Sequence, residues 1–352
     1  MRTEKKIQAV IALLMTLVMG GAFLAIFYFK DHSPIEEEHK AEVYMDEGES
    51  YSVLSFLRDK EEAQSHDLLM KLPAELDLSV ITYDNNSEGK TFSFSIPGIR
   101  EDYFRDFFMA GTKEGLLDIG FEFNDRRGLF KLFFKDITEV LPSGDGNYLF
   151  FDYMAPKEYY DSVVVLDPGY GGVETGAMAF GSIEKDIDLS IVMKLREAFS
   201  NEIASRKIGI YCTRKTDAYV NSEDRVSFAK GLDADLLLSV HCASTASGRE
   251  SDFSGTRVLY QVTDETGASK TFASLCLSKL IEKLSSTDRG IVAGDEDYLV
   301  REATMPVALC EIGYMTNANE LMKLKDDEYQ SMAAQALYEA VLSMLAGEEN
   351  DE

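Results

Sequence analysis

The chain has 352 residues, and 45% of them are hydrophobic, which is enough for one large folded domain or two modest ones. Its formal net charge is -27 at pH 7, with 62 acidic residues against 35 basic ones. Because nucleic-acid phosphates require clustered Lys and Arg, this balance argues against a nucleic acid as partner.

The uncharged segment 7–29, "IQAVIALLMTLVMGGAFLAIFYF", is the first predicted element. As a helix rising 1.5 Å per residue it spans roughly 34 Å, enough to cross a bilayer with some tilt. Arg2, Lys5 and Lys6 precede it and acidic residues follow it, so the positive-inside rule predicts a cytoplasmic N-terminus and an extracytoplasmic bulk. A signal peptide cleaved near "GGA" is the alternative, but the apolar run is longer than a usual signal core. We therefore expect a single-pass cell membrane protein.

Two segments of different composition follow. Residues 30–65 are rich in Glu, Asp, Ser and Lys and are predicted to form an acidic tether. Residues 66–156 contain short runs of alternating apolar and polar residues, separated by turn sequences such as "NDRRG" and "PSGDG". This pattern predicts a small all-β module, built as a sandwich. The last residues, 347–352, are an acidic tail.

Strands and helices alternate between residues 160 and 346. "SVVVLDPG" is a continuous apolar run, typical of a strand buried on both faces of a parallel sheet. "EKDIDLSIVMKLREAFSNEIA" predicts a long helix whose apolar residues Ile187, Ile191, Leu195 and Phe199 share one face. The alternation predicts an α/β domain with an open, mostly parallel sheet and helices on both faces.

Four cysteines lie in this half of the chain, each in or beside an apolar run and none in a C-x-x-C pair: Cys212, Cys242, Cys276 and Cys310. We expect buried thiols outside any disulfide.

Polar residues stand where several of these elements meet the loops. Tyr170 follows the first strand, Glu184 begins the first long helix, and His241 ends the strand "LLLSVH". Glu311 comes directly after the apolar run "PVALC", and partial burial of a carboxylate suits a general base. Because function gathers at the carboxyl ends of strands in such sheets, we expect these four side chains in one pocket.

Six motifs in order make residues 162–346 similar to the zinc-dependent N-acetylmuramoyl-L-alanine amidases that hydrolyse peptidoglycan. They are "DPGYGG", "GSIEKD", "TRKTD", "ADLLLSVHCAS", Arg289-Gly290 and "MPVALCEIGYMTN". The resemblance implies that Glu184 and His241 bind one zinc ion, that Glu311 is the catalytic base and that Arg289 contacts the substrate. Two imidazoles and a carboxylate leave one position of a zinc ion open for water, as hydrolysis requires.

The sequence departs from this family at two positions. The first zinc-binding His of the family is Tyr170 here, and an Asn near the site is Ala243. A phenol has a reference pKa of about 10 and must lose its proton to bind zinc, whereas neutral imidazole does not. The other histidines precede this domain, and Cys242 is expected to point away from the His241 face of its strand.

Two interpretations of the function therefore stay open. In one, the protein is an amidase that cleaves between the lactyl group of N-acetylmuramic acid and L-alanine, with Tyr170 either an unusual ligand or no ligand. In the other, it is a metal-deficient pseudoamidase that serves as a membrane-tethered peptidoglycan-binding or regulatory protein. Peptidoglycan is the expected partner in both. Residues 66–156 faintly resemble the β-sandwich wall-targeting modules that precede such amidases, and a β spacer is the alternative.

Overall fold

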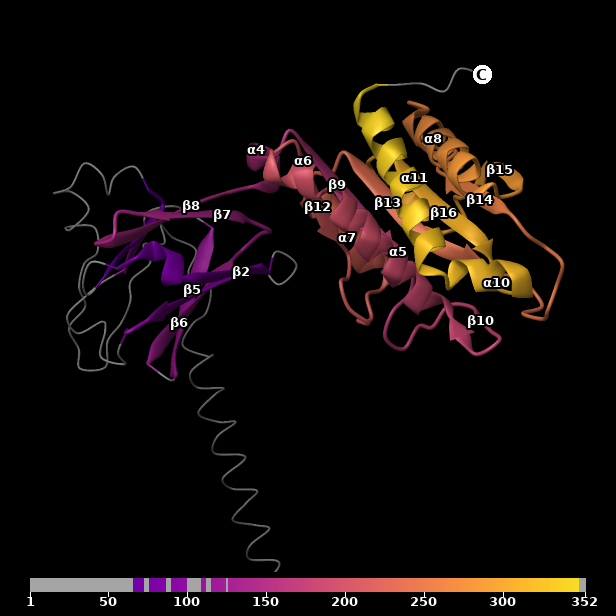
Figure 1. Cartoon of the computed structure of the whole chain (residues 1–352). Helices are drawn as coiled ribbons and strands as arrows, with labels where there is room; N and C mark the ends of the chain where they lie inside the picture. Colours follow the sequence, from indigo (N-terminus) through magenta and orange to yellow (C-terminus); the bar gives the residue numbers. More distant parts are fainter. Residues whose placement is uncertain are drawn as a thin grey trace, which may run out of the picture.

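The computed structural model describes residues 66–72, 76–86, 90–99, 109–111, 115–124 and 126–347 (Figure 1). The predicted transmembrane segment, the acidic tether and all but the first residue of the acidic tail lie outside these ranges. In the part of the chain that is described, no helix has both the length and the apolar character needed to cross a membrane.

The described residues between 66 and 154 form two antiparallel sheets, with strand orders β4-β1-β8-β7 and β2-β3-β6-β5. Their elements are β1 (Leu68–Lys71), η2 (Leu78–Val80), β2 (Thr82–Asn86), β3 (Thr91–Pro97), β4 (Met109–Gly111), β5 (Leu116–Asn124), β6 (Arg127–Phe134), β7 (Glu139–Gly144) and β8 (Tyr148–Met154). Buried aromatic side chains from both sheets share one core, in which the rings of Phe94 and Phe151 lie 4.6 Å apart. The two sheets are thus packed face to face.

Two details of this region depart from the simple alternation of strands and turns that the sequence predicts. The run "LDLSVITYD" begins as the 3-10 helix η2, because the side chain of Asp77 accepts a hydrogen bond from the Ser79 amide and starts a turn. The sequence "PSGDG" is only partly a turn, since β7 continues to Gly144. The tight turn is made by Asp145, whose carboxylate accepts the amides of Asn147 and Tyr148.

The rest of the described chain is an α/β domain. Its strands are β9 (Ser162–Pro168), β10 (Met178–Ala179), β11 (Ser182–Ile183), β12 (Ile208–Cys212), β13 (Leu236–Ala243), β14 (Thr256–Tyr260), β15 (Asp288–Ala293) and β16 (Val307–Tyr314). Its helices are α4 (Pro156–Tyr159), α5 (Glu184–Ala198), α6 (Ser200–Ala204), α7 (Ser222–Gly231), α8 (Ala268–Leu284), α9 (Tyr298–Glu302), α10 (Ala318–Leu324) and α11 (Asp327–Leu345).

The main sheet has the order β12-β9-β13-β16-β14-β15. All neighbouring pairs are parallel except β14 and β16, which are antiparallel. Helices α5, α8 and α11 cover one face (Figure 1), and buried residues of α7 and α9 pack against the other. The predicted α/β class, with a mostly parallel sheet between two layers of helices, is confirmed.

Local differences are small. The long helix predicted from Glu184 ends at Ala198, and a shorter helix, α6, begins after Phe199. The predicted apolar face is buried, with Ile187, Ile191, Leu195 and Phe199 all in the core. The edge strand β15 and the helices α9 and α10 were not predicted. All four cysteines are described, buried and outside any disulfide, as predicted.

Candidate metal and catalytic site

The candidate site lies where β9, β13 and β16 end. In the pairing of β13 with β16, His241 stands opposite Glu311. Paired residues on neighbouring parallel strands project to the same face, so these two side chains point the same way. The loop after β9 carries Tyr170, whose ring meets the His241 ring edge to face with centroids 5.1 Å apart.

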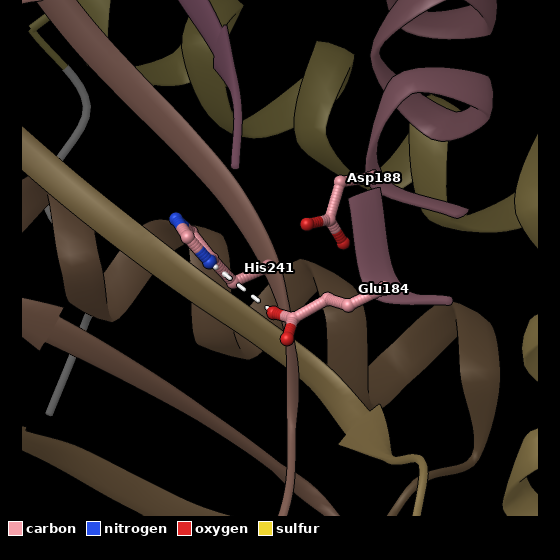
Figure 2. Close-up of side chains that lie close together, drawn as sticks. All are labelled: Glu184, Asp188 and His241. Atoms are coloured by element: carbon pink, nitrogen blue, oxygen red, sulfur yellow. Dashed lines mark hydrogen bonds and ion pairs between the residues drawn. The ribbon is translucent and has the colours of Figure 1, made fainter. Parts of the chain in front are cut away.

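Glu184 is held rigidly at the start of α5. Its side chain is 3% exposed, and an acidic group there is favoured by the helix dipole. The backbone amide of Ala177 donates to Oε2 at 2.7 Å, and that of Cys242 donates to Oε1 at 3.0 Å. Oε1 also lies 3.3 Å from Nδ1 of His241 (Figure 2). The structure thus brings two of the sequence-predicted ligands together within reach of one ion.

Asp188 joins this pair and was not predicted. It lies four residues after Glu184 on α5, and residues at that spacing share a helix face. Its side chain is fully buried, and neither oxygen has a hydrogen-bond partner among the described residues. The thiol of Cys242 is close enough to affect the carboxylate, but a thiol is a weak donor and does not satisfy it. One donor atom each from Glu184, Asp188 and His241 lies within 4.8 Å of the others.

The pKa values of Asp188, His241 and Tyr170 are shifted by burial and by the charges of their neighbours. Burial raises the pKa of Asp188 well above its usual range, and the charge of Glu184 raises it further. Burial alone would lower the pKa of His241, but the hydrogen bond with Glu184 and the charge of Asp188 raise it to about 9. Burial and the charges of Glu184 and Asp188 also raise the pKa of Tyr170 to about 12, so its phenol is neutral at physiological pH.

A divalent cation fits the three residues. Catalytic zinc is held by three protein ligands drawn from imidazole and carboxylate groups, with a further position open. Glu184, Asp188 and His241 supply such a set, and the unsatisfied carboxylate of Asp188 is the kind of group that a cation would neutralise.

Glu311 lies beside this group and is fixed by a residue that the sequence did not reveal. Arg257 of β14 stands directly opposite it in the antiparallel pairing with β16. The guanidinium bonds both carboxylate oxygens: Nε contacts Oε2, and Nη2 donates to Oε1 at 3.0 Å. The Glu311 side chain is 15% exposed. A bidentate pair of this kind sets the orientation of the carboxylate.

The comparison with known families agrees with this geometry. The family model described as N-acetylmuramoyl-L-alanine amidase matches residues 164–343, about half of the chain. The chain belongs to this family. The resemblance drawn from the six sequence motifs is therefore confirmed.

Individual relatives each match about half of the chain. The uncharacterized protein YqiI of Bacillus subtilis is 34% identical over 182 residues, which is 51% of this chain and 82% of that protein. The N-acetylmuramoyl-L-alanine amidase LytC of the same organism is 31% identical over 180 residues, which is 51% of this chain but only 35% of LytC. The crystal structure of an N-acetylmuramoyl-L-alanine amidase from Clostridium difficile 630 is 29% identical and has a TM-score of 0.49, covering 53% of this chain and 97% of that one.

The loop "DPGYGG" of this amidase-family protein needs its glycines. A Cβ at Gly169 would lie 2.3 Å from the His241 ring, so a side chain there would displace the imidazole. Tyr170 itself has a φ of 54°, in the left-handed region that few residues other than glycine adopt readily. Its carbonyl accepts a hydrogen bond from Nη2 of Arg225 at 2.6 Å, and that of Gly169 accepts one from Nη2 of Arg214 at 2.6 Å. Two buried arginines thus hold the loop against the site.

Arg289, the predicted substrate contact, lies apart from the metal group. It is exposed on the edge strand β15, three places from β13 in the sheet, which is roughly 14 Å at about 4.8 Å per strand. Its Nε donates to the carbonyl of Ser254 at 2.6 Å, and its guanidinium lies 5.6 Å from the ring centre of Phe253. In this amidase-family protein Arg289 can contact only a ligand that extends well beyond the metal group.

Proposed function

We propose that this protein is an N-acetylmuramoyl-L-alanine amidase that hydrolyses the amide between the lactyl group of N-acetylmuramic acid and L-alanine in peptidoglycan. The observation that carries this proposal is the group of Glu184, Asp188 and His241 beside Glu311, at the carboxyl edge of an amidase-family sheet. A zinc ion held there would supply the Lewis acidity that amide hydrolysis at neutral pH requires.

The protein's own residues supply the proton transfers. Glu311 takes a proton from the attacking water as the new carbon–oxygen bond forms at the lactyl carbonyl. It then returns that proton to the alanine nitrogen as the carbon–nitrogen bond breaks. Arg257 keeps the carboxylate aimed at this position through its two hydrogen bonds. The products are a free lactyl carboxylate and a peptide with a new amino-terminal alanine.

Glu311→Gln tests this function, because it keeps the side-chain shape and removes the base. Release of peptides with amino-terminal alanine from purified peptidoglycan should fall at least about a hundredfold. Zinc affinity should change little, since Glu311 is not one of the three grouped residues. Glu302→Gln, which changes a half-buried glutamate on α9 away from the grouped residues, is the matched control and should keep full activity. Undiminished release by Glu311→Gln would place the base elsewhere.

A second candidate function follows from Tyr170. Its neutral phenol stands where the family resemblance expects a zinc-binding histidine, and this favours a metal-deficient peptidoglycan-binding protein. Under this alternative the purified chain holds no zinc, releases no alanine-terminated peptide, and still sediments with insoluble peptidoglycan. Zinc content and peptide release measured on the same preparation separate the two functions.

We also propose that segment 7–29 anchors the chain in the cell membrane, with the bulk outside. The support is the uncharged length of the segment and the basic residues before it. Protease added to intact cells should then remove most of the protein. Digestion that requires lysed cells would show the opposite orientation.

A further inference from the structure

We propose that Asp188 is the third protein ligand of the metal, so that the site is built from two carboxylates and one imidazole and does not depend on residue 170. This inference rests on the proposed amidase function for its metal and goes beyond it in naming the ligand. Neither the family resemblance nor the sequence motifs point to Asp188.

The first argument is that no donor stronger than the Cys242 thiol satisfies Asp188 in the described structure. It is fully buried on α5, and both of its oxygens lack hydrogen-bond partners. Buried carboxylates are almost always paired, hydrogen-bonded or bound to a metal, because an unsatisfied one opposes folding. The nearby cation is already engaged, because Arg214 donates to the carbonyls of Gly169 and Lys185 and not to Asp188.

The second argument is direction. Because Glu184 and Asp188 are four residues apart on one helix, they present their carboxylates to the same side. Figure 2 shows both carboxylates and the His241 imidazole facing a common space. Donor atoms around a tetrahedral zinc ion are about 3.4 Å apart when the bonds are about 2.1 Å. The Glu184–His241 distance of 3.3 Å already matches this, and no distance in the group exceeds 4.8 Å. Metal binding would draw the Asp188 carboxylate closer to the other two donors.

The third argument concerns the alternatives. Both Tyr170 and Asp188 must be deprotonated to bind a cation well, and burial raises the pKa of each. The carboxyl group starts from a reference pKa about six units lower than that of a phenol, so a cation ionises it more readily. Cys242 offers a soft thiolate, but its sulfur is outside the group of donor atoms that lie within 4.8 Å. The proposed site has one imidazole and two carboxylates, and carboxylate oxygens suit manganese better than imidazole does. The ratio of its zinc affinity to its manganese affinity should therefore be smaller than that of a site with two imidazoles.

Three substitutions in the full-length protein separate these ligands. Asp188→Asn removes the anionic ligand and keeps the shape, Tyr170→Phe removes only the phenol oxygen, and Asp186→Asn neutralises an exposed carboxylate on the same helix as a matched control. We expect the zinc dissociation constant, measured by competition with a chelator, to rise at least about tenfold in Asp188→Asn. It should change less than about threefold in Tyr170→Phe and Asp186→Asn. A circular dichroism spectrum and a melting curve without metal verify that each variant is folded.

A new absorption band can test whether residue 188 binds the metal, without relying on a loss of zinc affinity. Asp188→Cys places a thiolate at the proposed ligand position, and Co²⁺ bound to a thiolate shows an intense charge-transfer absorption in the near ultraviolet. We expect this band in Asp188→Cys loaded with Co²⁺, and not in the parent or in Asp186→Cys. The parent also controls for the native thiol of Cys242.

The outcomes are distinct from those of the proposed function. Parent-like zinc affinity in Asp188→Asn, absence of the cobalt band in Asp188→Cys, or a parent that binds neither metal would overturn the ligand assignment. If peptide release persists while Asp188→Asn binds zinc normally, the amidase function stands and this inference fails. If zinc binding depends on Asp188 but the parent releases no peptide, the ligand assignment stands and the amidase function fails.

Discussion

Two buried aspartates near the same edge of the sheet have opposite surroundings. Asp167, 1% exposed, accepts hydrogen bonds from Thr213 Oγ1 at 2.5 Å, Ser239 Oγ at 2.6 Å and Nη1 of Arg225 at 2.6 Å. Asp188, equally buried, accepts none from the described residues. The first carboxylate is satisfied by the fold and holds the loop after β9 in place. The second is left unsatisfied by the fold, and that difference is what marks it as a ligand.

The largest expected effect is the loss of folding stability when Asp167, the hydrogen-bonded aspartate, is changed. Asp167→Asn removes the charge that compensates Arg225, whose guanidinium is itself buried. Breaking a buried ion pair from one side typically costs about 3–5 kcal/mol, so the free energy of unfolding should fall by that amount. Urea unfolding of the metal-free protein measures it. A loss below about 1 kcal/mol would mean that the network around Asp167 is not what stabilises this edge.

Urea unfolding of Asp188→Asn should show the opposite change, a gain in the stability of the metal-free protein. Folding must protonate the Asp188 carboxylate or bury its charge, as its raised pKa shows, and the amide removes this cost. The free energy of unfolding of the metal-free protein should therefore rise by about 1–3 kcal/mol. The stabilisation that saturating zinc adds to the parent should shrink in this variant, because the ligand is gone. If Asp188→Asn instead destabilises the metal-free protein, Asp188 is a structural residue like Asp167 and the contrast disappears.

A smaller change in the stability of the metal-free protein is expected when the pH is raised. The pKa of His241 is raised from its usual 6.5 to about 9, so its stabilisation is complete below pH 6.5 and is lost as pH rises toward 9. The raised pKa of Asp188 acts in the same direction, since folding favours its protonated form. The metal-free protein should therefore lose about 1 kcal/mol between pH 7 and pH 8. Zinc should reverse this slope, because its ligands bind only when deprotonated. A metal-free stability that rises over this interval would contradict the assigned shifts.

The sequence predicted the parts of the site that stand at the ends of strands and helices. Glu184 and His241 were identified because they stand at a helix start and a strand end and match the motifs "GSIEKD" and "ADLLLSVHCAS" of the family, and the parallel sheet predicted that they lie close together. Asp188 was hidden because it lies inside the predicted helix, where an acidic residue next to Ile187 looks like a solvated position. Only the placement of β13 against α5 shows that it is buried and faces His241.

Arg257 was missed for a different reason. Its strand was predicted, but not the antiparallel pairing of β14 with β16, and only that pairing sets the guanidinium opposite Glu311. A charged residue in an edge-like strand is ordinarily exposed, so nothing in the local pattern distinguished Arg257.

For Asp188 the sequence did contain a usable signal. A second carboxylate four residues after a metal ligand on a helix lies on the same face as that ligand.

The central claim is that Glu184, Asp188 and His241 hold one metal ion together. A crystal structure of the zinc-loaded protein, with the ion located by anomalous scattering, tests it most directly. The ion should lie about 2.0–2.2 Å from one oxygen of Glu184, one oxygen of Asp188 and one ring nitrogen of His241. An ion bound to the phenol oxygen of Tyr170, with the Asp188 carboxylate outside bonding distance, would contradict the account.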